Sequence, residues 1–240
     1  MFLSNTATGF GGGAFVNDAT TLNGGLFQNN HSTSSFGIGG GGLFSFSTLA
    51  LTGTQFIGNS GTNGGGLYAS DGGRFVNALF ARNTASSTLG SAIFVNSGSV
   101  QSVQILHTTI TSPTVGSGSA IYNAAGIIGI TDTIISRYSI GINNVGGTVY
   151  EDYNLFFGNP ISRTGTIGGA NDVVGDPKFV NPAADNYHLQ PGSAAINHGI
   201  DAGVTTDIDG QARPLNGLFD IGFDELQIYS IYLPLVLKHS

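Results

Sequence analysis

The sequence has 240 residues, of which 39 are Gly, none is Cys and 9% are charged, and its formal net charge is -7. The absence of Cys excludes a small scaffold held by disulfides, and no run approaches the 18 or so apolar residues of a membrane-spanning helix. Residues 1–150 contain three acidic and three basic residues and are therefore neutral. Because nucleic-acid binding needs a basic stripe, we expect no nucleic-acid partner.

A five-residue pattern, the pentad, recurs along the chain as three small residues, one aliphatic or small residue and one aromatic residue. The five copies are residues 11–15, 40–44, 64–68, 90–94 and 118–122. Their aromatic members lie 29, 24, 26 and 28 residues apart. A repeat of this length predicts a solenoid or array.

A second pattern, Phe-x-x-Asn, keeps a constant phase with the pentad. It begins at Phe2, Phe27, Phe56, Phe80 and Phe156. In three successive repeats its Phe follows the pentad aromatic by 12 residues, whereas the stretch from this Phe to the next pentad varies in length. We therefore expect one side of each repeat to be fixed and the other to accept insertions.

The local pattern indicates strands. Segments 51–57, 75–80, 100–110 and 127–135 are rich in Val, Ile, Thr and Phe and are bounded by Gly, Asn, Asp and Ser. Three short strands per repeat predict an all-β fold, a right-handed single-stranded parallel β-helix whose rungs stack about 4.8 Å apart.

Stacked rungs bring equivalent side chains together. We expect the pentad aromatics to form an inward-facing ladder. Asn5, Asn30, Asn59 and Asn83 should form a second ladder at a turn, because an Asn amide can bond the amides above and below it and Asn tolerates a left-handed backbone.

The chain divides into three parts. Residues 1–150 are predicted to be β-helix rungs; the first is half a rung, which favours a C-terminal piece of a longer solenoid that lacks its N-terminal cap. Residues 151–228 bring Pro, acidic residues and longer connections, and we expect them to form the last rung and an irregular C-terminal cap that folds back over the end. Residues 229–240 are an apolar tail, which fits a strand on the cap and a sorting or attachment tail equally well.

Few residues of the solenoid are candidates for chemistry. Asp71, Arg74 and Arg82 are its only group of mixed charge, although Asp71-Gly72-Gly73 is typical of a turn. Hydrolysis by two carboxylates needs a pair of them, and Asp132 has no acidic neighbour in the sequence, so we expect it to be a solvated strand residue. We assign no catalytic residue here.

Two features of residues 151–228 resemble metal sites only superficially. The segment from Asp207 to Gly210 begins like a calcium loop, but Leu218 stands where that loop needs Glu. We expect a structural turn stabilised by Arg213.

The histidines show no metal-ligand spacing. His188 and His198 lie ten residues apart, the latter beside Asn197, while His31 and His107 are isolated. We predict no bound metal and no cofactor.

The repeats support a family resemblance. The paired patterns over residues 2–83 resemble the repeats of polymorphic outer membrane proteins, and residues 90–145 resemble generic right-handed β-helix rungs. Segments 175–182, 187–199, 207–214 and 220–222 are similar to the end of bacterial choice-of-anchor Q proteins. Those are β-helix proteins of the cell surface or medium, so the resemblance implies this fold and an extracellular or cell-surface location, and says little about activity.

Two functions from different classes remain open. The first is a non-catalytic, monomeric scaffold outside the cell that contacts neutral glycans or cell-envelope polymers, for instance in adhesion. The alternative is the C-terminal part of a pectate-lyase-like carbohydrate-active enzyme, a polysaccharide lyase or glycoside hydrolase, whose active site lies mostly upstream. Stacked acids and bases in upstream rungs would favour the enzyme.

Overall fold

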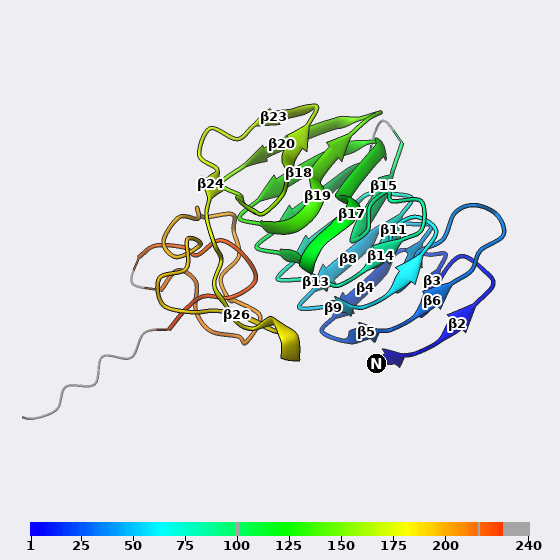
Figure 1. Ribbon diagram of the computed structural model, residues 1–240, viewed down its shortest axis with the longest axis horizontal. Coiled ribbons are helices and arrows are strands. Elements are labelled where there is room, and N and C mark those ends of the chain that lie inside the picture. Colours follow the sequence, from blue (N-terminus) through cyan, green and yellow to red (C-terminus); the bar gives the residue numbers. More distant parts are fainter. Residues whose placement is uncertain (99–100, 216, 228–240) are drawn as a thin grey trace, which may run out of the picture.

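The computed structural model describes residues 1–98, 101–215 and 217–227, and it is a right-handed parallel β-helix of about six turns (Figure 1). The predicted fold class is confirmed. In the described part of the chain, the regular structure outside the strands is one 3-10 turn, η1 (Pro182–Ala184). The predicted tail, residues 229–240, lies outside the described residues.

Each rung contributes a strand to three faces of the solenoid. The Phe-x-x-Asn face contains β1 (Phe2–Leu3), β5 (Leu26–Gln28), β9 (Gln55–Ile57), β13 (Leu79–Ala81), the start of β17 (Thr109–Ala125), the start of β19 (Ile134–Asn144), β21 (Leu155–Phe157) and β24 (Val173–Val174). The pentad face contains β3 (Ala14–Val16), β7 (Leu43–Ser45), β11 (Leu67–Ala69), β15 (Ile93–Asn96), the ends of β17 and β19, and β22 (Ile161–Thr164). The long strands β17 and β19 join these two faces into one 13-stranded sheet.

The third face is a separate seven-stranded parallel sheet. Its strands are β4 (Thr20–Asn23), β8 (Leu49–Thr52), β12 (Gly73–Val76), β16 (Ser102–Leu106), β18 (Ile127–Thr131), β20 (Thr148–Asp152) and β23 (Thr166–Gly168). Between the first two faces, a row of two-residue strands forms a smaller, four-stranded sheet: β2 (Thr6–Ala7), β6 (His31–Ser32), β10 (Ser60–Gly61) and β14 (Thr84–Ala85).

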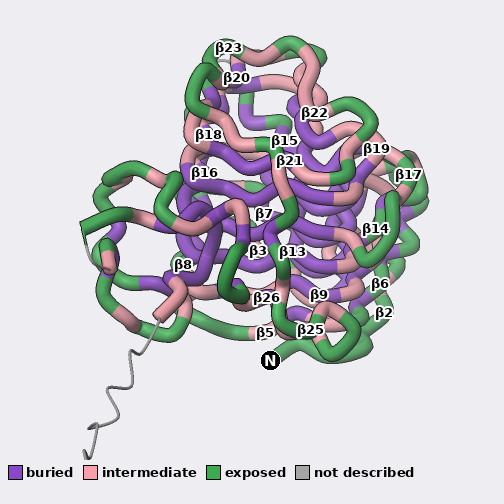
Figure 2. The backbone as a smooth tube through the Cα atoms, turned by 60° about the vertical axis from the view of Figure 1, so that its left-hand side comes forward, coloured by how far each residue is buried: buried purple, intermediate pink, exposed green. Residues whose placement is uncertain are grey.

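The interior of the solenoid is a stack of apolar side chains, and Figure 2 shows buried residues along successive rungs. Phe27, Phe56 and Phe80 lie inside it, and their ring centroids are 4.8 and 4.7 Å apart along the stack. The rung spacing of about 4.8 Å sets these distances. The inward aromatic ladder therefore belongs to the Phe-x-x-Asn pattern.

The prediction that the pentad aromatics point inward is wrong. Successive strand residues face opposite ways, and it is the fourth pentad residue, such as Leu43 or Leu67, that enters the main core. Phe44 and Tyr68 stack outside it with centroids 4.5 Å apart. They are still buried, because Phe10, Ile38, Leu89 and further residues of the variable loops pack over them.

The small residues of the pentad allow adjacent rungs to approach closely. A Cβ on Gly41 would lie 2.3 Å from the carbonyl oxygen of Gly65. A Cβ on Gly65 would lie 2.3 Å from the carbonyl oxygen of Thr84. Such contacts exclude any side chain at these two positions.

The predicted Asn ladder is confirmed. Asn5 donates its Nδ2 to Asn30 Oδ1 at 2.8 Å, Asn30 to Asn59 at 2.9 Å, and Asn59 to Asn83 at 3.0 Å. The backbone N–H groups of Asn5, Asn30 and Asn59 donate to the same oxygens. The left-handed residue is the one before each ladder Asn: Ser4, Asn29, Gly58 and Arg82 have φ of 52°, 54°, 66° and 58°.

The C-terminal segment, residues 175–227, does not fold over the end of the solenoid as expected. It packs along one flank, beside the stack in Figure 1. Tyr187 clusters with Ile57 and Leu79, while Ile221 clusters with Ile134 and Leu155. The segment thus crosses several rungs, because apolar side chains near the turns of this flank offer it a continuous surface.

The apolar interior instead ends in an ion-paired cluster in the last rung. Arg163 takes the register position of Ile142, and its guanidinium carbon lies 5.4 Å from the centre of the Phe156 ring. Its Nε is 2.9 Å from Glu151 Oε1 and its NH1 is 2.8 Å from Asp172 Oδ2. Both carboxylates are buried. They balance the positive charge of Arg163 at the last rung, where the apolar stack ends.

The Asn ladder should respond to the loss of one member. Asn59→Ala removes the acceptor of two Asn30 donors and the donor to Asn83, so we expect the free energy of unfolding to fall by about 1–3 kcal/mol. Denaturant unfolding measures this, with Asn5→Ala at the exposed start of the ladder as the milder control. An unchanged midpoint for Asn59→Ala would contradict the ladder's role.

The ion-paired cluster gives a second prediction. Arg163→Ala leaves Glu151 and Asp172 buried without their counter-ion, so it should cost about 3 kcal/mol of stability at pH 8. Burial raises the pKa of Glu151 to about 7. The carboxyl is therefore neutral at pH 5, and the loss should be smaller there than at pH 8. Arg74→Ala on the exposed third face is the control and should change stability by less than about 0.5 kcal/mol.

Candidate functional site

The group of mixed charge predicted in the solenoid does not assemble. Arg82 pairs with Asp185 of the C-terminal segment, with Nε at 2.8 Å and NH2 at 2.6 Å from its two oxygens. Asp71 closes its own turn by accepting from the Gly72 backbone N–H at 2.8 Å. Arg74 is exposed on the third face. The turn at Asp71 is confirmed, and Arg82 acts as an anchor for the flanking segment.

Asp132 is not a solvated strand residue, so that prediction is wrong. It sits at a left-handed turn with φ of 52°, and its side chain is fully buried. His107 occupies the matching turn of the previous rung, and its Nε2 lies 3.2 Å from Asp132 Oδ2. Asp132 Oδ1 accepts from the backbone N–H of Ile200 at 2.9 Å, which fixes the flanking segment to the solenoid.

Burial makes this pair neutral between about pH 3 and pH 7. Desolvation, followed by the Arg213 charge, lowers the pKa of His107 to about 3. Desolvation raises the pKa of Asp132 to about 7. Near pH 5 the pair is therefore an uncharged imidazole beside a protonated carboxyl. A neutral pair suits the buried contact between the solenoid and the C-terminal segment.

The turn at Asp207 is structural, as predicted, but Arg213 does not stabilise it directly. Asp207 Oδ1 accepts from the backbone N–H groups of Asp209 and Gln211 at 2.9 and 2.8 Å. Arg213 is buried and pairs with Glu225 at 2.9 Å.

The other histidines differ in their surroundings. The Nδ1 atoms of His31 and His198 bond Ser60 Oγ at 2.7 Å and the Ile196 carbonyl at 2.8 Å. Asn197 adopts a left-handed φ of 59° and donates its backbone N–H to Asp220. His188 approaches two acidic side chains from distant parts of the chain, a proximity that sequence spacing does not reveal.

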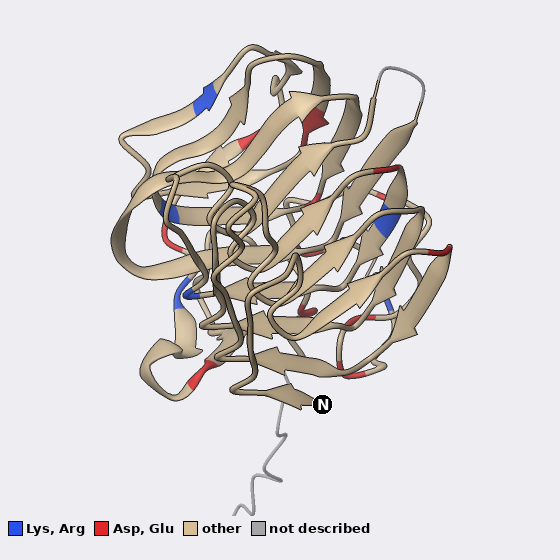
Figure 3. Cartoon of the chain, turned by 90° about the vertical axis from the view of Figure 1, so that its right-hand side faces the viewer, with Lys and Arg blue, Asp and Glu red and all other residues tan. Residues whose placement is uncertain are grey.

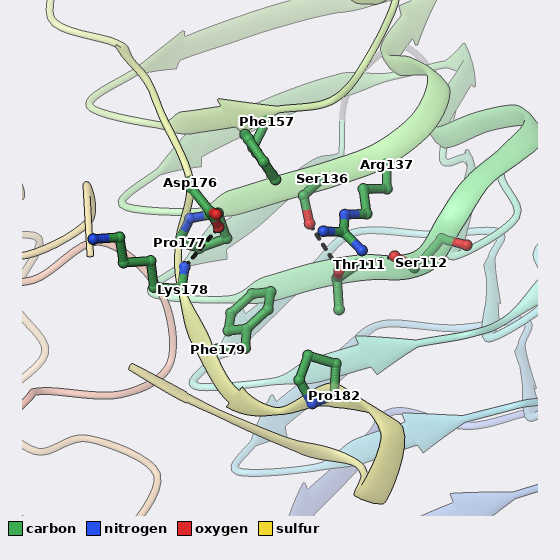
Figure 4. Close-up of a pocket in the computed structure, with 10 residues that line it drawn as sticks. All are labelled: Thr111, Ser112, Ser136, Arg137, Phe157, Asp176, Pro177, Lys178, Phe179 and Pro182. Carbon is green, nitrogen blue, oxygen red and sulfur yellow. Dashed lines mark hydrogen bonds between the residues drawn. The ribbon is translucent and has the colours of Figure 1, made fainter. Parts of the chain in front are cut away.

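A small cavity of about 160 Å³ lies where the flanking segment meets the solenoid (Figure 4). Its polar groups are largely bonded to one another or to backbone. Ser136 Oγ donates to Thr111 Oγ1 at 2.7 Å, and Arg137 donates to the Pro113 carbonyl at 2.8 Å. The Lys178 side chain points away from Arg137 in Figure 4. We interpret this cavity as a gap left where the flanking segment packs on the solenoid, and not as a binding site.

A larger open groove, of about 430 Å³, lies on the third face near the last rungs. The residues that line it are Gln104, Ile127, Gly129, Thr131, Tyr150, Glu151, Asp152, Ile167 and Gly168. Strand register places Gln104, Gly129, Tyr150 and Ile167 side by side across β16, β18, β20 and β23. These four residues form one outward row, which we call the groove row.

The groove row combines amide, aromatic and aliphatic groups. Tyr150 and Ile167 are 54% and 55% exposed. A Cβ on Gly129 would lie 2.6 Å from Gln104 Oε1, so Gly at this position leaves room for the Gln104 amide to lie flat on the sheet. The result is a shallow surface with one ring face and several hydrogen-bonding groups.

The charge in the groove is low. No Lys or Arg is among the described residues that line it, and charged residues, blue and red in Figure 3, are sparse along the solenoid. Glu151 is buried against Arg163. Asp152 accepts from the backbone N–H and the Nδ2 of Asn171, both at 2.8 Å, and so holds the loop at the rim. The sequence reasoning missed this site, although the exposed aromatic of an alternating strand, Tyr150, was a usable signal.

In comparisons with known proteins, no family model, curated protein or solved structure matches this chain. The resemblances to polymorphic outer membrane repeats and to choice-of-anchor Q proteins therefore stay predictions. Among the described residues, no helix is long and apolar enough to cross a membrane.

The buried pair of His107 and Asp132 gives a prediction about pH. Between about pH 4 and 6.5 the unfolded chain carries one proton on His107 and the folded chain carries one on Asp132, so the pair adds no pH dependence. In Asp132→Asn the folded chain has lost the carboxyl that binds its proton. Only the unfolded chain, through His107, then takes up a proton as the pH falls. Stability of this variant should therefore fall by about 2 kcal/mol, relative to the wild type, from pH 7.5 to 5.

Urea unfolding of both proteins across this pH range measures the difference. The double variant His107→Gln with Asp132→Asn is the control, because it removes both titrating groups. Its free energy of unfolding should differ from that of the wild type by the same amount at every pH in this range. A constant difference between Asp132→Asn and the wild type would show that the pair does not titrate as stated.

Proposed function

We propose that this protein is a non-catalytic β-helix scaffold that binds neutral glycans, or cell-envelope polymers of the same chemistry, in the groove of the third face. The observation that carries the proposal is the groove row. It exposes the Tyr150 ring beside the Gln104 amide and the Ile167 side chain, in register on a rigid parallel sheet.

The chemistry of such a surface suits sugars. A sugar ring has an apolar face that can pack on an aromatic side chain, and hydroxyl groups that need donors and acceptors at its edge. Tyr150 offers the ring face, while Gln104, Thr131 and Asp152 offer polar groups around it. The lack of basic residues in the lining gives an acidic polymer no counter-charge there.

An extracellular or cell-surface location is part of this proposal. It is supported by the composition, which has no Cys and few charges, and by the resemblances described above. A scaffold exposed to the medium can use stacking in place of disulfides for its stability.

The alternative of a carbohydrate-active enzyme has less support from the described residues. The arginines closest to carboxylates, Arg82, Arg163 and Arg213, form ion pairs that hold the fold together. The mixed-charge group that could have formed a catalytic set is dispersed.

Binding to soluble β-glucan, xylan and mannan, measured by calorimetry or affinity electrophoresis, tests the proposal. We expect Tyr150→Ala to weaken binding at least about 10-fold, since one aromatic contact contributes about 1.5 kcal/mol. Phe46→Ala is the matched control, because Phe46 is also about half exposed, at 55%, and lies outside the groove.

Two outcomes would contradict the proposal. One is the absence of binding to every neutral glycan tested. The other is binding that Tyr150→Ala and Phe46→Ala affect equally. Release of reducing ends or unsaturated products from pectin or alginate would favour the enzyme instead.

A further inference from the structure

A different cluster of side chains lies within the C-terminal segment and shares no residue with the groove. It consists of His188 on β26 (Asn186–Leu189), Asp209 in the turn at 207–211, and Asp224 near the end of the described chain. Each residue offers one ligand atom, and these atoms all lie within 4.8 Å of one another. The shortest contact is 3.0 Å, between His188 Nε2 and Asp209 Oδ2.

The hydrogen bonds of His188 define its tautomer. Its Nδ1 lies 2.8 Å from Asn186 Oδ1. That amide oxygen is identified as an acceptor because it also receives the backbone N–H of His188 at 3.2 Å. His188 Nδ1 therefore carries a proton and donates it, which leaves Nε2 of the neutral ring with a lone pair.

This lone pair faces a carboxylate. His188 Nε2 is shielded from solvent and makes no hydrogen bond, yet it points at Asp209 Oδ2. Two acceptors at 3.0 Å repel each other unless a cation lies between them, and that cation is either a second ring proton, as in the His188–Asp209 ion pair, or a metal ion. A second-shell acceptor on Nδ1 and an open Nε2 are the arrangement usual for a metal-binding histidine.

Asp224 adds a second negative group on the buried side. It is 5% exposed, and Leu189 donates its backbone N–H to Asp224 Oδ2 at 2.7 Å. Burial raises the pKa of Asp224, although the hydrogen bond from Leu189 and the charge of His188 act in the opposite direction. Among the described residues no Lys or Arg forms an ion pair with Asp209 or Asp224, so His188 is the one basic side chain there that faces these two carboxylates.

We propose that His188, Asp209 and Asp224 bind one divalent transition-metal ion of the Zn²⁺ class. One imidazole nitrogen and two carboxylate oxygens are a donor set that such ions accept, whereas Ca²⁺ prefers six to eight oxygens. Ligand atoms about 2.0–2.1 Å from a tetrahedral ion lie roughly 3.3 Å from one another, close to the spacing of the tightest pair here.

The ion would act as a structural clip. Its three ligands come from β26, from the turn that begins at Asp207, and from the stretch beside Phe223 that packs against the solenoid. These stretches are joined by few strand pairs of their own. Binding of the ion to the native state alone would stabilise the flanking segment on the solenoid.

The test is Zn²⁺ binding by the full, metal-stripped chain, measured by competition with a chromophoric chelator and by thermal unfolding. The chain has no Cys, so no thiolate competes for the ion. We expect one equivalent to bind and to raise Tm by about 5–10 °C at a free Zn²⁺ concentration 100 times the Kd. Ca²⁺ at the same concentration should leave Tm unchanged.

Variants distinguish binding at this site from nonspecific Zn²⁺ binding elsewhere on the chain. Asp209→Asn keeps the size of a 46% exposed side chain and removes its charge, and it should weaken Zn²⁺ binding more than about 100-fold. Asn186→Ala should weaken it about 10–100-fold, as expected for the loss of a second-shell acceptor. His198→Ala, an exposed histidine of the same segment, should have no effect.

Three results would overturn the inference. The first is no binding by the wild type at micromolar Zn²⁺. The second is binding that survives Asp209→Asn, and the third is binding that His198→Ala abolishes. Failure of glycan binding would leave this site unaffected, because the two share no residue.

Discussion

The whole protein depends on the in-register stacking of each rung on the next. Parallel backbone pairing holds successive strands about 4.8 Å apart, and every equivalent position becomes a column of side chains. Phe27, Phe56 and Phe80 form one such column, and Asn30, Asn59 and Asn83 form another. A rung buries its apolar side chains only against its neighbours, so stability is shared along the stack.

Charge is placed where stacking stops. Inside the solenoid the strands pair with those of the next rung, and charged side chains are few. In the last rung Arg163, Glu151 and Asp172 close the interior. In the irregular C-terminal segment, where few strand pairs exist, carboxylates such as Asp207 and Asp220 accept the backbone N–H groups that a sheet would otherwise satisfy.

The same arrangement decides which surfaces are free to bind. The flank at the turn of His107 and Asp132 is covered by the C-terminal segment, and the outer ladder of pentad aromatics is covered by loops. The third face keeps an open row across its last strands. An open row on a paired sheet fits the extended polymer of the proposed function better than a small, enclosed ligand.

Much of the fold could be predicted from the sequence, because the repeat is local. Within each rung, the pentad and the Phe-x-x-Asn pattern report the strand period and the position of the Asn ladder directly. The sequence did not show which residue of each pentad points inward, since alternation places Leu43 and Phe44 on opposite sides without saying which side the loops will cover.

The sequence by itself thus determined the β-helix, its phase and its neutral body, because these follow from interactions between residues one rung apart. Tertiary structure alone decided the pairing of Arg82 with Asp185, of His107 with Asp132, and of His188 with Asp209. Two of these contacts involve the C-terminal segment, whose path along the flank is set by apolar packing that no repeat records. The third joins turn residues whose burial depends on that same path.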